Sequence, residues 1–380
     1  MRKKLIICIP TENEANTIRH VVKIIDQGIG YYYPDWEALI VNADNDSDDE
    51  TQDLFLSTPT KTAKHHITTF SKGKGENIVA FLQYALPLKP EAIAFFDGDL
   101  LNLDPSWVKN LIHPIAAGNA DVVFPGYSTS QGGPLRNLLS YPAILGLFGL
   151  DVEQPTGGEL GLGPVFCDYL STLDWTKAPR GYGIDFFMAS HAAISGVRSV
   201  TSVLGQKIHT AKPWHSIGHI VMEVVECILS QSALHTTGRR LGAADIQTRS
   251  SAADCSDDEA AAPLKAPIDI EALKSVLTDR LNGSAASNDE LPEFVLDSIL
   301  HVDEDVGVTD DVWVRSLSSL VHAARYKPDS IRLFADVATT LFFARMLIYA
   351  GEIVSMDEKT IRVESRLRGL RLSENVHFHS

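Results

Sequence analysis

At residues 92–99 the chain reads Ala-Ile-Ala-Phe-Phe-Asp-Gly-Asp, an apolar run that ends in two carboxylates separated by one glycine. The apolar and aromatic composition of the first five residues predicts a buried strand. In open α/β sheets ligands bind beyond the carboxyl ends of the strands, so Asp97 and Asp99 are expected at a ligand site. Carboxylate oxygens at this spacing suit Mg²⁺ or Mn²⁺ on a diphosphate. The alternative is two exposed turn acids with no ligand.

Short apolar runs of this kind alternate with helical segments up to about residue 206, which predicts an α/β fold with a mostly parallel sheet covered by helices. The predicted strands are Leu5–Pro10, Ala38–Asn42, His66–Phe70, Ala92–Phe96, Asp121–Phe124 and Ser199–Leu204. The predicted helices of this part are Glu14–Gln27, Gly75–Leu86, Pro105–Ala117, Arg136–Phe148, Ile184–Gly196 and Ile217–Gln231.

The composition changes near residue 243, where Ala, Ser, Asp and Pro replace the periodic apolar pattern. Residues 243–267 therefore read as a solvated, flexible linker. Four segments with apolar residues at helical spacing follow it, which predicts an all-helical C-terminal domain. These helices are Ile268–Leu281, Leu291–Leu300, Asp310–Ala324 and Asp329–Tyr349. We therefore expect an α/β domain over 1–242, a linker over 243–267 and a helical domain over 268–380.

The overall composition of the 380 residues excludes several classes of protein. Hydrophobic residues make up 44% and charged residues 22%, which is typical of a globular protein rather than a disordered or fibrous one. The formal charge of −16 argues against non-specific binding to nucleic acid or to an anionic membrane. An anionic ligand therefore needs a local cationic device, such as a metal ion, a few lysines or a helix N-terminus.

Membrane insertion and secretion are not expected. The longest apolar stretches are either too short to span a bilayer or carry Arg345 near the middle. The first apolar run, after Met1-Arg-Lys-Lys4, is too short for a signal-peptide core. The four cysteines lie far apart without CxxC spacing, so we predict no disulfide framework and a cytoplasmic location.

Three polar turns follow the first three predicted strands. The first, Pro10-Thr-Glu-Asn-Glu14, lacks the Gly-x-Gly-x-x-Gly pattern of a dinucleotide fold. The second, Asn42–Asp49, is strongly acidic and could equally be a set of helix caps. The third, Ser71-Lys-Gly-Lys-Gly-Glu76, places Lys74 at a helix N-terminus that favours a negative group, although it is not a Walker A loop and a plain surface turn is the alternative.

Three further motifs lie downstream, and each has a structural alternative. They are a glycine-rich turn over Glu153–Glu159, a helix start over Arg180–Asp185 in which Asp185 could be an N-cap, and a basic segment over Lys207–Pro213 whose His209 could be a surface histidine. A phosphatase of the haloacid dehalogenase type also uses Asp-x-Asp. In that class the pair normally follows the first strand, whereas here it follows the fourth.

Taken in order, these motifs resemble those of the retaining GT-A glycosyltransferases that make glucosyl-3-phosphoglycerate, and of their relatives the mannosylglycerate synthases. The resemblance spans about Leu5 to Ser230, and the helical tail looks more like that of the mannosylglycerate synthases. The motifs that carry it are Pro10–Glu14, Asn45–Asp49, Gly73–Glu76, Asp97-Gly98-Asp99, Gln154–Glu159, Gly181–Asp185 and His209-x-x-Lys-Pro213-x-x-x-Ile-Gly218.

The resemblance implies a nucleotide diphosphate sugar along the carboxyl edge of the sheet. Asp185, Lys74 and Asp97 would be the catalytic residues, with Asp185 facing the sugar hydroxyls. A divalent metal, Mg²⁺ or Mn²⁺, would be held by Asp99 and His209 and would stabilise the leaving diphosphate. The residues implied to bind the nucleotide sugar are Pro10, Thr11, Glu14, Asn45, Lys74, Asp97, Gly98, Gln154, Thr156, Gly158 and Glu159.

Two departures from the family pattern concern charge. His209 is followed by Thr210 where the family has His-Arg, so diphosphate charge would fall to Lys207 and Lys212. The family's acceptor loop, Gly-Gly-Arg-x-Thr, is here Gly132-Gly133-Pro134-Leu135-Arg136, with the arginine two places later. A single guanidinium could clamp glycerate, 3-phosphoglycerate or another small hydroxy acid.

We therefore expect acceptor contacts from Gly133, Arg136 and Tyr182 in a cytoplasmic, metal-dependent, retaining enzyme that transfers glucose or mannose to glycerate or 3-phosphoglycerate. The alternatives are the Asp-x-Asp phosphatase and a nucleotide-sugar binding protein without turnover. The donor base and the assembly state, monomer or homodimer, are not encoded in these motifs.

Overall fold

The computed structural model describes residues 2–127, 133–209, 214–235, 268–283, 290–303 and 305–378. Its contacts divide these residues into two compact units. The α/β unit comprises residues 2–127 and 156–209. The helical unit comprises the described residues of 133–155 and of 214–378.

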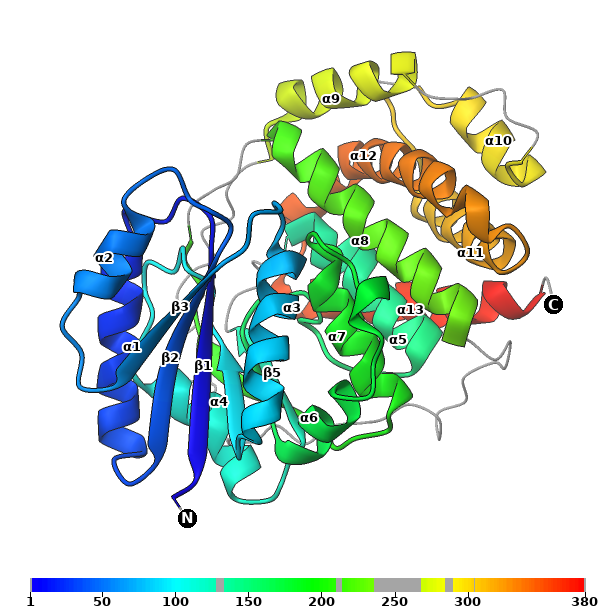
Figure 1. Ribbon diagram of the computed structural model, residues 1–380. Helices are drawn as coiled ribbons and strands as arrows, with labels where there is room; N and C mark the ends of the chain where they lie inside the picture. Colours follow the sequence, from blue (N-terminus) through cyan, green and yellow to red (C-terminus); the bar gives the residue numbers. More distant parts are fainter. Residues whose placement is uncertain are drawn as a thin grey trace. The chain divides into compact units, whose positions relative to one another are not determined.

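A seven-stranded sheet forms the α/β unit (Figure 1), with the strand order β3-β2-β1-β4-β6-β5-β7. All neighbours pair in parallel except β6, which is antiparallel to both β4 and β5. The carboxyl ends of six strands therefore lie at one edge, where β6 begins. The strands are β1 (Lys4–Thr11), β2 (Glu37–Asp44), β3 (Ala63–Thr68), β4 (Ala92–Phe95), β5 (Val122–Tyr127), β6 (Leu160–Leu162) and β7 (Ser199–Gly205).

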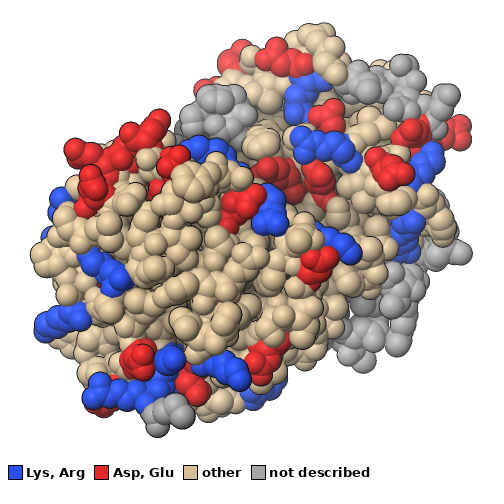
Figure 2. Space-filling model, viewed as in Figure 1, with Lys and Arg blue, Asp and Glu red and all other residues tan. Residues whose placement is uncertain are grey.

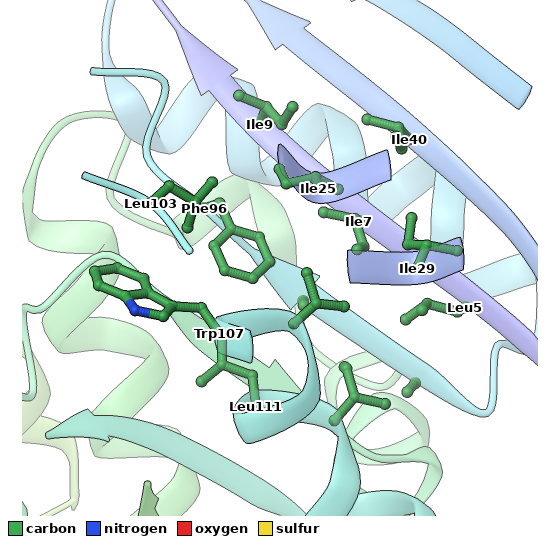
Figure 3. Packing of buried hydrophobic residues seen from close by; sticks show 14 of the residues in the cluster. Leu5, Ile7, Ile9, Ile25, Ile29, Ile40, Phe96, Leu103, Trp107 and Leu111 are labelled. Atoms are coloured by element: carbon green, nitrogen blue, oxygen red, sulfur yellow. The ribbon is translucent and has the colours of Figure 1, made fainter. Parts of the chain in front are cut away.

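One face of the sheet is covered by α1 (Ile18–Tyr32) and α4 (Ser106–Ala116). Alternate residues of β1 point into this layer, as the two-residue period of a strand requires, and pack against apolar residues at helical spacing in α1 (Figure 3). Phe96 and Trp107 close the layer beside α4 (Figure 3). This packing fixes the strand ends that carry the polar turns.

The other face is covered by α3 (Lys74–Ala85) and α7 (Gly183–Ile194). Phe81 of α3 meets Phe95 of β4 in an edge-on contact with ring centroids 5.3 Å apart. Both faces are thus buried, as expected for parallel strands that read as continuous apolar runs. The remaining regular elements of this unit are α2 (Thr51–Ser57), η1 (Leu86–Leu88), α6 (Pro164–Leu170) and η3 (Trp175–Lys177).

The predicted α/β fold with a mostly parallel sheet is confirmed, but strand β6 and helices α2, α6 and α13 (Glu358–Phe378) were not predicted. Strand β6 has three residues, too few to show a strand period, and it reverses the direction of the sheet locally. Helix α6 is a seven-residue element that follows it immediately. Helix α13 carries many charged residues, which obscured its apolar face.

The helical unit contains α5 and α8 as well as the predicted C-terminal helices. The predicted division placed both helices in the α/β domain over 1–242. In the structure α5 packs on α13, and α8 packs on α11 and α12. The predicted boundary at residue 242 and the predicted linker lie outside the described residues. The elements are η2, a π-helical turn (Leu135–Ser140), α5 (Tyr141–Phe148), α8 (Trp214–His235), α9 (Ile270–Gly283), α10 (Glu293–Leu300), α11 (Asp310–Tyr326), η5 (Pro328–Ser330), α12 (Ile331–Ser355) and α13.

Two helices of this unit are long and apolar enough to cross a membrane when judged by length and composition alone. They are α8 and α12, and 78% of the apolar window of α12 is buried inside the unit. The core helix of a soluble protein passes the same test. The expectation that the chain does not insert into a membrane stays a prediction.

A partly buried carboxylate, that of Asp310, holds three helices of this unit together. Asp310, in the first turn of α11, accepts hydrogen bonds from Arg345 of α12 and from Arg368 and Arg371 of α13. Burial alone would raise the pKa of Asp310, but the three guanidinium groups hold it below its ordinary value. The ionised carboxylate is therefore the form that stabilises the unit.

We expect Asp310→Asn to lower the free energy of unfolding by about 3 kcal/mol at pH 7, because the buried guanidinium of Arg368 loses its anion and that of Arg345 keeps only Glu352. Since the pKa of Asp310 is lower in the folded chain, its contribution is complete above its unfolded pKa of about 3.9 and is lost as the pH falls through the folded value. Thermal denaturation of both proteins at pH 7 and near pH 3 should therefore show the difference in Tm shrinking in acid.

Asp311→Asn is the matched control, because Asp311 is 68% exposed and only faces Arg315 at 3.6 Å. Its loss should change stability by less than about 0.5 kcal/mol. An equal effect of both substitutions would contradict the role given to Asp310.

Candidate active site

The turn that carries Lys74 is built to lie against the backbone of residues 179–181. Gly73 has a φ of +129°, and a Cβ there would lie 2.3 Å from the Arg180 carbonyl oxygen. A Cβ on Gly75 would lie 2.1 Å from the Pro179 carbonyl oxygen. The Gly75 and Glu76 amides donate to the carbonyl oxygens of Gly181 and Arg180. The glycines on both sides of Lys74 therefore bring it to the start of α7, which carries Asp185.

The loop after β4 packs against the end of β1 in a similar way. A Cβ on Gly98 would lie 2.6 Å from Thr11 Cγ2 and 3.0 Å from the Pro10 carbonyl oxygen. The Gly98 carbonyl oxygen accepts a hydrogen bond from Thr17 Oγ1 at 2.7 Å. The contact holds the turn that carries Asp97 and Asp99 against the end of β1.

Asp97 lies between two lysines. Its Oδ1 is 2.9 Å from Lys74 Nζ and its Oδ2 is 2.8 Å from Lys207 Nζ. Lys74 Nζ also contacts Asp185 Oδ2 at 2.9 Å. Side-chain exposure is between 13% and 21% for all four groups, so these ion pairs are largely shielded from water.

Lys207 extends this row of charges to Glu159. Its ammonium donates to the Gly157 carbonyl oxygen at 2.7 Å and to the Glu159 carboxylate at 3.0 Å. The Glu159 side chain is fully buried, and its second partner is the hydroxyl of Tyr127, which donates to Glu159 Oε2 and to the Gly157 carbonyl oxygen. The result is an alternating set of groups, which we call the charge row: Asp185, Lys74, Asp97, Lys207 and Glu159.

The pKa values within the charge row follow from burial and neighbours. Burial alone would raise the pKa of Asp97, but Lys207 and Lys74 hold it well below its ordinary value. Burial raises the pKa of Asp185 and of Glu159, because each has only one lysine beside it. Burial alone would lower the pKa of both lysines, and the adjacent carboxylates instead raise it. Both lysines therefore remain cationic at neutral pH.

Asp99 and His209 lie together beside the charge row. Their closest atoms, Asp99 Oδ2 and His209 Nδ1, are 3.8 Å apart. Backbone pairing between Leu100 and His209, with the Leu101 amide donating to the Ile208 carbonyl oxygen, holds the two segments in place. A carboxylate and an imidazole at this separation are the donor types that a divalent transition metal accepts. Among the described residues no group of three or more His, Cys, Asp or Glu side chains has an arrangement that could hold a metal ion.

Four of the residues predicted to contact the nucleotide are already bonded or packed within the turns that follow β1 and β2. Thr11 and Asn45 are both buried, and Thr11 Oγ1 donates to Asp44 Oδ1 at 2.5 Å. The Asn45 amide is bonded within the turn that carries Lys74. Pro10 ends β1 beside Gly98, and the Glu14 backbone amide donates to Thr51 Oγ1 at 2.8 Å. These four residues lie at the carboxyl edge, and their contacts with a nucleotide remain a prediction.

The contacts of the acidic turn after β2 favour the structural alternative, in which its carboxylates cap helices and order turns. Acidic side chains gather on the surface beside α2 (Figure 2). Asp49 accepts hydrogen bonds from the Ala15 and Thr51 amides, and Asp44 accepts one from the Ser47 amide. These carboxylates therefore order the turns that follow β1 and β2, as Asx turns commonly do.

Three predicted residues belong to the helical unit: Gly133, Arg136 and Gln154. Arg136 is only 3% exposed, and its guanidinium donates to the Glu153 carboxylate, the Glu153 carbonyl oxygen and Asn137. These bonds favour a structural role, and its contact with an acceptor remains a prediction. Tyr182, at the start of α7, and Thr156 belong to the α/β unit, whereas Lys212 lies outside the described residues.

Two contributing residues, Tyr127 and Asn77, escaped prediction from the sequence, and so did the pairing of Arg180, which lies in the predicted motif over Arg180–Asp185. Tyr127 ends β5 and reaches Glu159, a pairing between segments 32 residues apart. Arg180 pairs with Glu76 at 3.2 Å across 104 residues. No local spacing signals such contacts. The position of Tyr127 at a strand's carboxyl end was the available clue.

With this geometry established, comparison with known proteins relates this part of the chain to a known family. Residues 6–160, less than half of the chain, match the model of glycosyl transferase family 2. A curated glucosyl-3-phosphoglycerate synthase from Mycolicibacterium smegmatis is 25% identical over 256 residues, which cover 61% of this chain and 78% of that protein.

Solved structures show the same fold. The synthase of Mycobacterium tuberculosis, in complex with Mn²⁺, UDP and glucosyl-3-phosphoglycerate, has a TM-score of 0.52 at 22% identity, covering 63% of this chain and 83% of that chain. Its complex with Mg²⁺ and UDP gives the same values. The GT-A fold and the predicted enzyme class, a glycosyltransferase that uses a nucleotide sugar, are confirmed.

Gly158 offers a test of the charge row. It has a φ of +90°, and a Cβ there would lie 2.1 Å from Asp97 Oδ2. We expect Gly158→Ala to displace Asp97 from the lysines and to lower kcat/KM at least about 10-fold, in keeping with the cost of misplacing a reacting group. Steady-state kinetics would measure this.

Gly118→Ala is the control for backbone strain alone, because Gly118 has a φ of +73° and nothing within 4 Å of its added Cβ. Both variants should lose about 1 kcal/mol of stability from the left-handed conformation, but only Gly158→Ala should lose activity. Full activity in Gly158→Ala would show that Asp97 need not be held where it lies.

Proposed function

We propose that this chain is a metal-dependent, retaining hexosyltransferase that moves a sugar from a nucleotide diphosphate sugar to a small hydroxy acid. The proposed donor is UDP-glucose and the proposed acceptor is 3-phosphoglycerate, with mannose and glycerate as the alternatives to be tested. The observation that carries the proposal is the charge row beside Asp99 and His209, at the carboxyl edge of a glycosyltransferase domain.

Charge balance supports a divalent cation in this site. Four carboxylates (Asp97, Asp99, Glu159 and Asp185) and two lysines give the site a formal charge of −2 when all are ionised. Largely shielded charge of this size requires a counter-charge, and one divalent ion supplies it. Asp99 and His209 offer the donors, and the related synthase of Mycobacterium tuberculosis binds Mn²⁺ or Mg²⁺ together with UDP. When bound, such an ion stabilises negative charge on the leaving diphosphate.

The residues of the chain supply the rest of the electrostatic work. Lys74 and Lys207 present two fixed ammonium groups that favour a diphosphate next to the metal ligands. Asp185 is held by Lys74 at the start of α7, and burial raises its pKa because it disfavours the ionised carboxylate. Hydrogen bonds from sugar hydroxyls would stabilise that ionised form. Asp185 and Lys74 are two of the three residues that the sequence resemblance implies to be catalytic, and their roles remain a prediction.

The donor and acceptor are taken from the relatives. Complexes of the Mycobacterium tuberculosis synthase contain UDP-glucose and phosphoglyceric acid, and the curated relative is a glucosyl-3-phosphoglycerate synthase. The acceptor carries a carboxylate and a phosphate, so its site must contribute cationic or backbone N–H groups beyond those of the charge row.

The phosphatase alternative is disfavoured by the position of the Asp-x-Asp pair. In that class the pair normally follows the first strand, whereas Asp97-Gly98-Asp99 follows β4. A binding protein without turnover remains the second alternative, and it differs from the proposal only in forming no product.

A screen of donors against acceptors tests the proposal directly. UDP-glucose, GDP-glucose, UDP-mannose and GDP-mannose would each be incubated with D-glycerate or 3-phosphoglycerate and Mg²⁺ or Mn²⁺, with products detected by mass spectrometry. We expect a hexosyl adduct of 3-phosphoglycerate from UDP-glucose, with the donor's α configuration retained in its NMR coupling constants. Binding of the nucleotide sugar without any adduct would favour the non-catalytic alternative, and phosphate release from simple monoesters would favour the phosphatase.

Substitution of the two proposed metal ligands tests whether turnover requires a divalent cation. Asp99→Ala and His209→Ala should each lower turnover by about 10³-fold or more, because the leaving diphosphate loses its Lewis acid. Circular dichroism should show an unchanged fold, since both side chains lie at loop edges. Excess EDTA should have the same effect on the wild-type enzyme, and full activity in EDTA would refute the metal dependence.

A further inference from the structure

We propose that Asn77 and Asn45 form a buried amide pair whose function is to hold Lys74 in its catalytic position. This assignment rests on the proposed function, since Lys74 is there given the diphosphate. Each residue is only 1% exposed, and both side-chain amides are bonded to the turn or to each other. Both are therefore positioning residues that act through the turn over Gly73–Gly75.

Asn45 connects the end of β2 to that turn. Its Oδ1 accepts a hydrogen bond from the Gly73 amide at 3.1 Å, immediately before Lys74. Its Nδ2 lies 3.0 Å from the Ser71 carbonyl oxygen and 2.8 Å from Asn77 Oδ1. One side chain therefore contacts the turn both as an acceptor and as a donor, which an ionised aspartate could not do because it has no donor.

Asn77 connects the same turn to two other strands. Its Nδ2 donates to the Thr11 carbonyl oxygen, at the end of β1, at 3.0 Å. Its Oδ1 accepts from Asn45 Nδ2 and from Thr69 Oγ1, the latter at 2.7 Å. The first turn of α3 is thus bonded to the segments that end or follow β1, β2 and β3.

The consequence for Lys74 is geometric. The turn is fixed on one side by these amides and on the other by the backbone of residues 179–181. Lys74 Nζ lies 2.9 Å from both Asp97 and Asp185. The amide pair and the backbone of residues 179–181 together position the turn from which this side chain extends. An ammonium on a four-carbon chain has many rotamers, and their restriction before substrate binds is what pre-organisation requires.

A double-mutant cycle tests the pair. Asn77→Ala should lower kcat about 10- to 100-fold in the wild-type background, the range expected when a catalytic group moves by about 1 Å. In the Lys74→Met background the same substitution should change kcat by less than about 3-fold, because Asn77 acts through Lys74. The loss of Tm caused by Asn77→Ala should be the same in both backgrounds, so a merely structural role would not produce this pattern.

Asn110→Ala is the matched control, since Asn110 Nδ2 also donates to a backbone carbonyl oxygen, that of Val203, at 3.0 Å. It should lower kcat little, and equally in both backgrounds. If Asn77→Ala does not fold, Asn77→Asp keeps the size and the Oδ1 acceptor while removing the donor to Thr11, and it enters the same cycle. Equal, multiplicative losses of kcat in both backgrounds would overturn the inference.

Hydrogen exchange separates this inference from the proposed function, because it needs no activity. Asn77→Ala should speed exchange of the amides over residues 71–77 at least about 10-fold, whereas Asn110→Ala should not. Absence of hexosyl transfer by the wild-type chain would refute the proposed function alone. Unchanged exchange over 71–77 would refute the amide pair, whatever the reaction.

Discussion

Two lysines sharing one buried carboxylate are the constraint on which the α/β unit depends. Asp97 is held between Lys74 and Lys207, so each of these three charged groups has an oppositely charged partner. An unpaired charge that is shielded from water would be strongly destabilising. The partners come from the ends of different elements: the loop after β4, the start of α3 and the segment after β7. The order of the strands, with β6 inserted antiparallel beside β4, is what places Glu159 at the same edge.

Such close convergence needs positions without a side chain. A Cβ on Gly73, Gly75, Gly98 or Gly158 would lie between 2.1 and 2.6 Å from a neighbouring atom. At Gly98 the neighbour is the end of β1, and at Gly158 it is Asp97 itself. The glycines therefore set how near the loops come, while the charges set which side chains meet. Both are local features of short polar turns, which is why these turns are visible in the sequence.

What the sequence predicted is the part of the structure that local spacing encodes. The six longer strands, the Asp97-Gly-Asp99 pair and Lys74 at a helix start all follow from apolar runs that end in polar turns. Strand β6 was missed because three residues carry no period, and α13 because its charges mask its apolar face. Tyr127 and Asn77 were missed for another reason: their partners are brought together only by the tertiary fold. The same holds for Arg136, whose burial by Glu153 no motif could indicate.

The charge row also affects how much of the site's interaction energy would go to substrate binding and how much to stabilising the transition state. In the structure both ammonium groups are already bonded to Asp97, so under the proposed function a diphosphate would compete with a carboxylate for them. This competition weakens ground-state binding, but it leaves the lysines fixed and dehydrated where charge would develop in the transition state. Fixed charges that need no reorganisation accelerate the reaction rather than tighten substrate binding. A cation held by Asp99 and His209 would then add affinity for the diphosphate without disturbing the lysines, so the two halves of the site have separable roles.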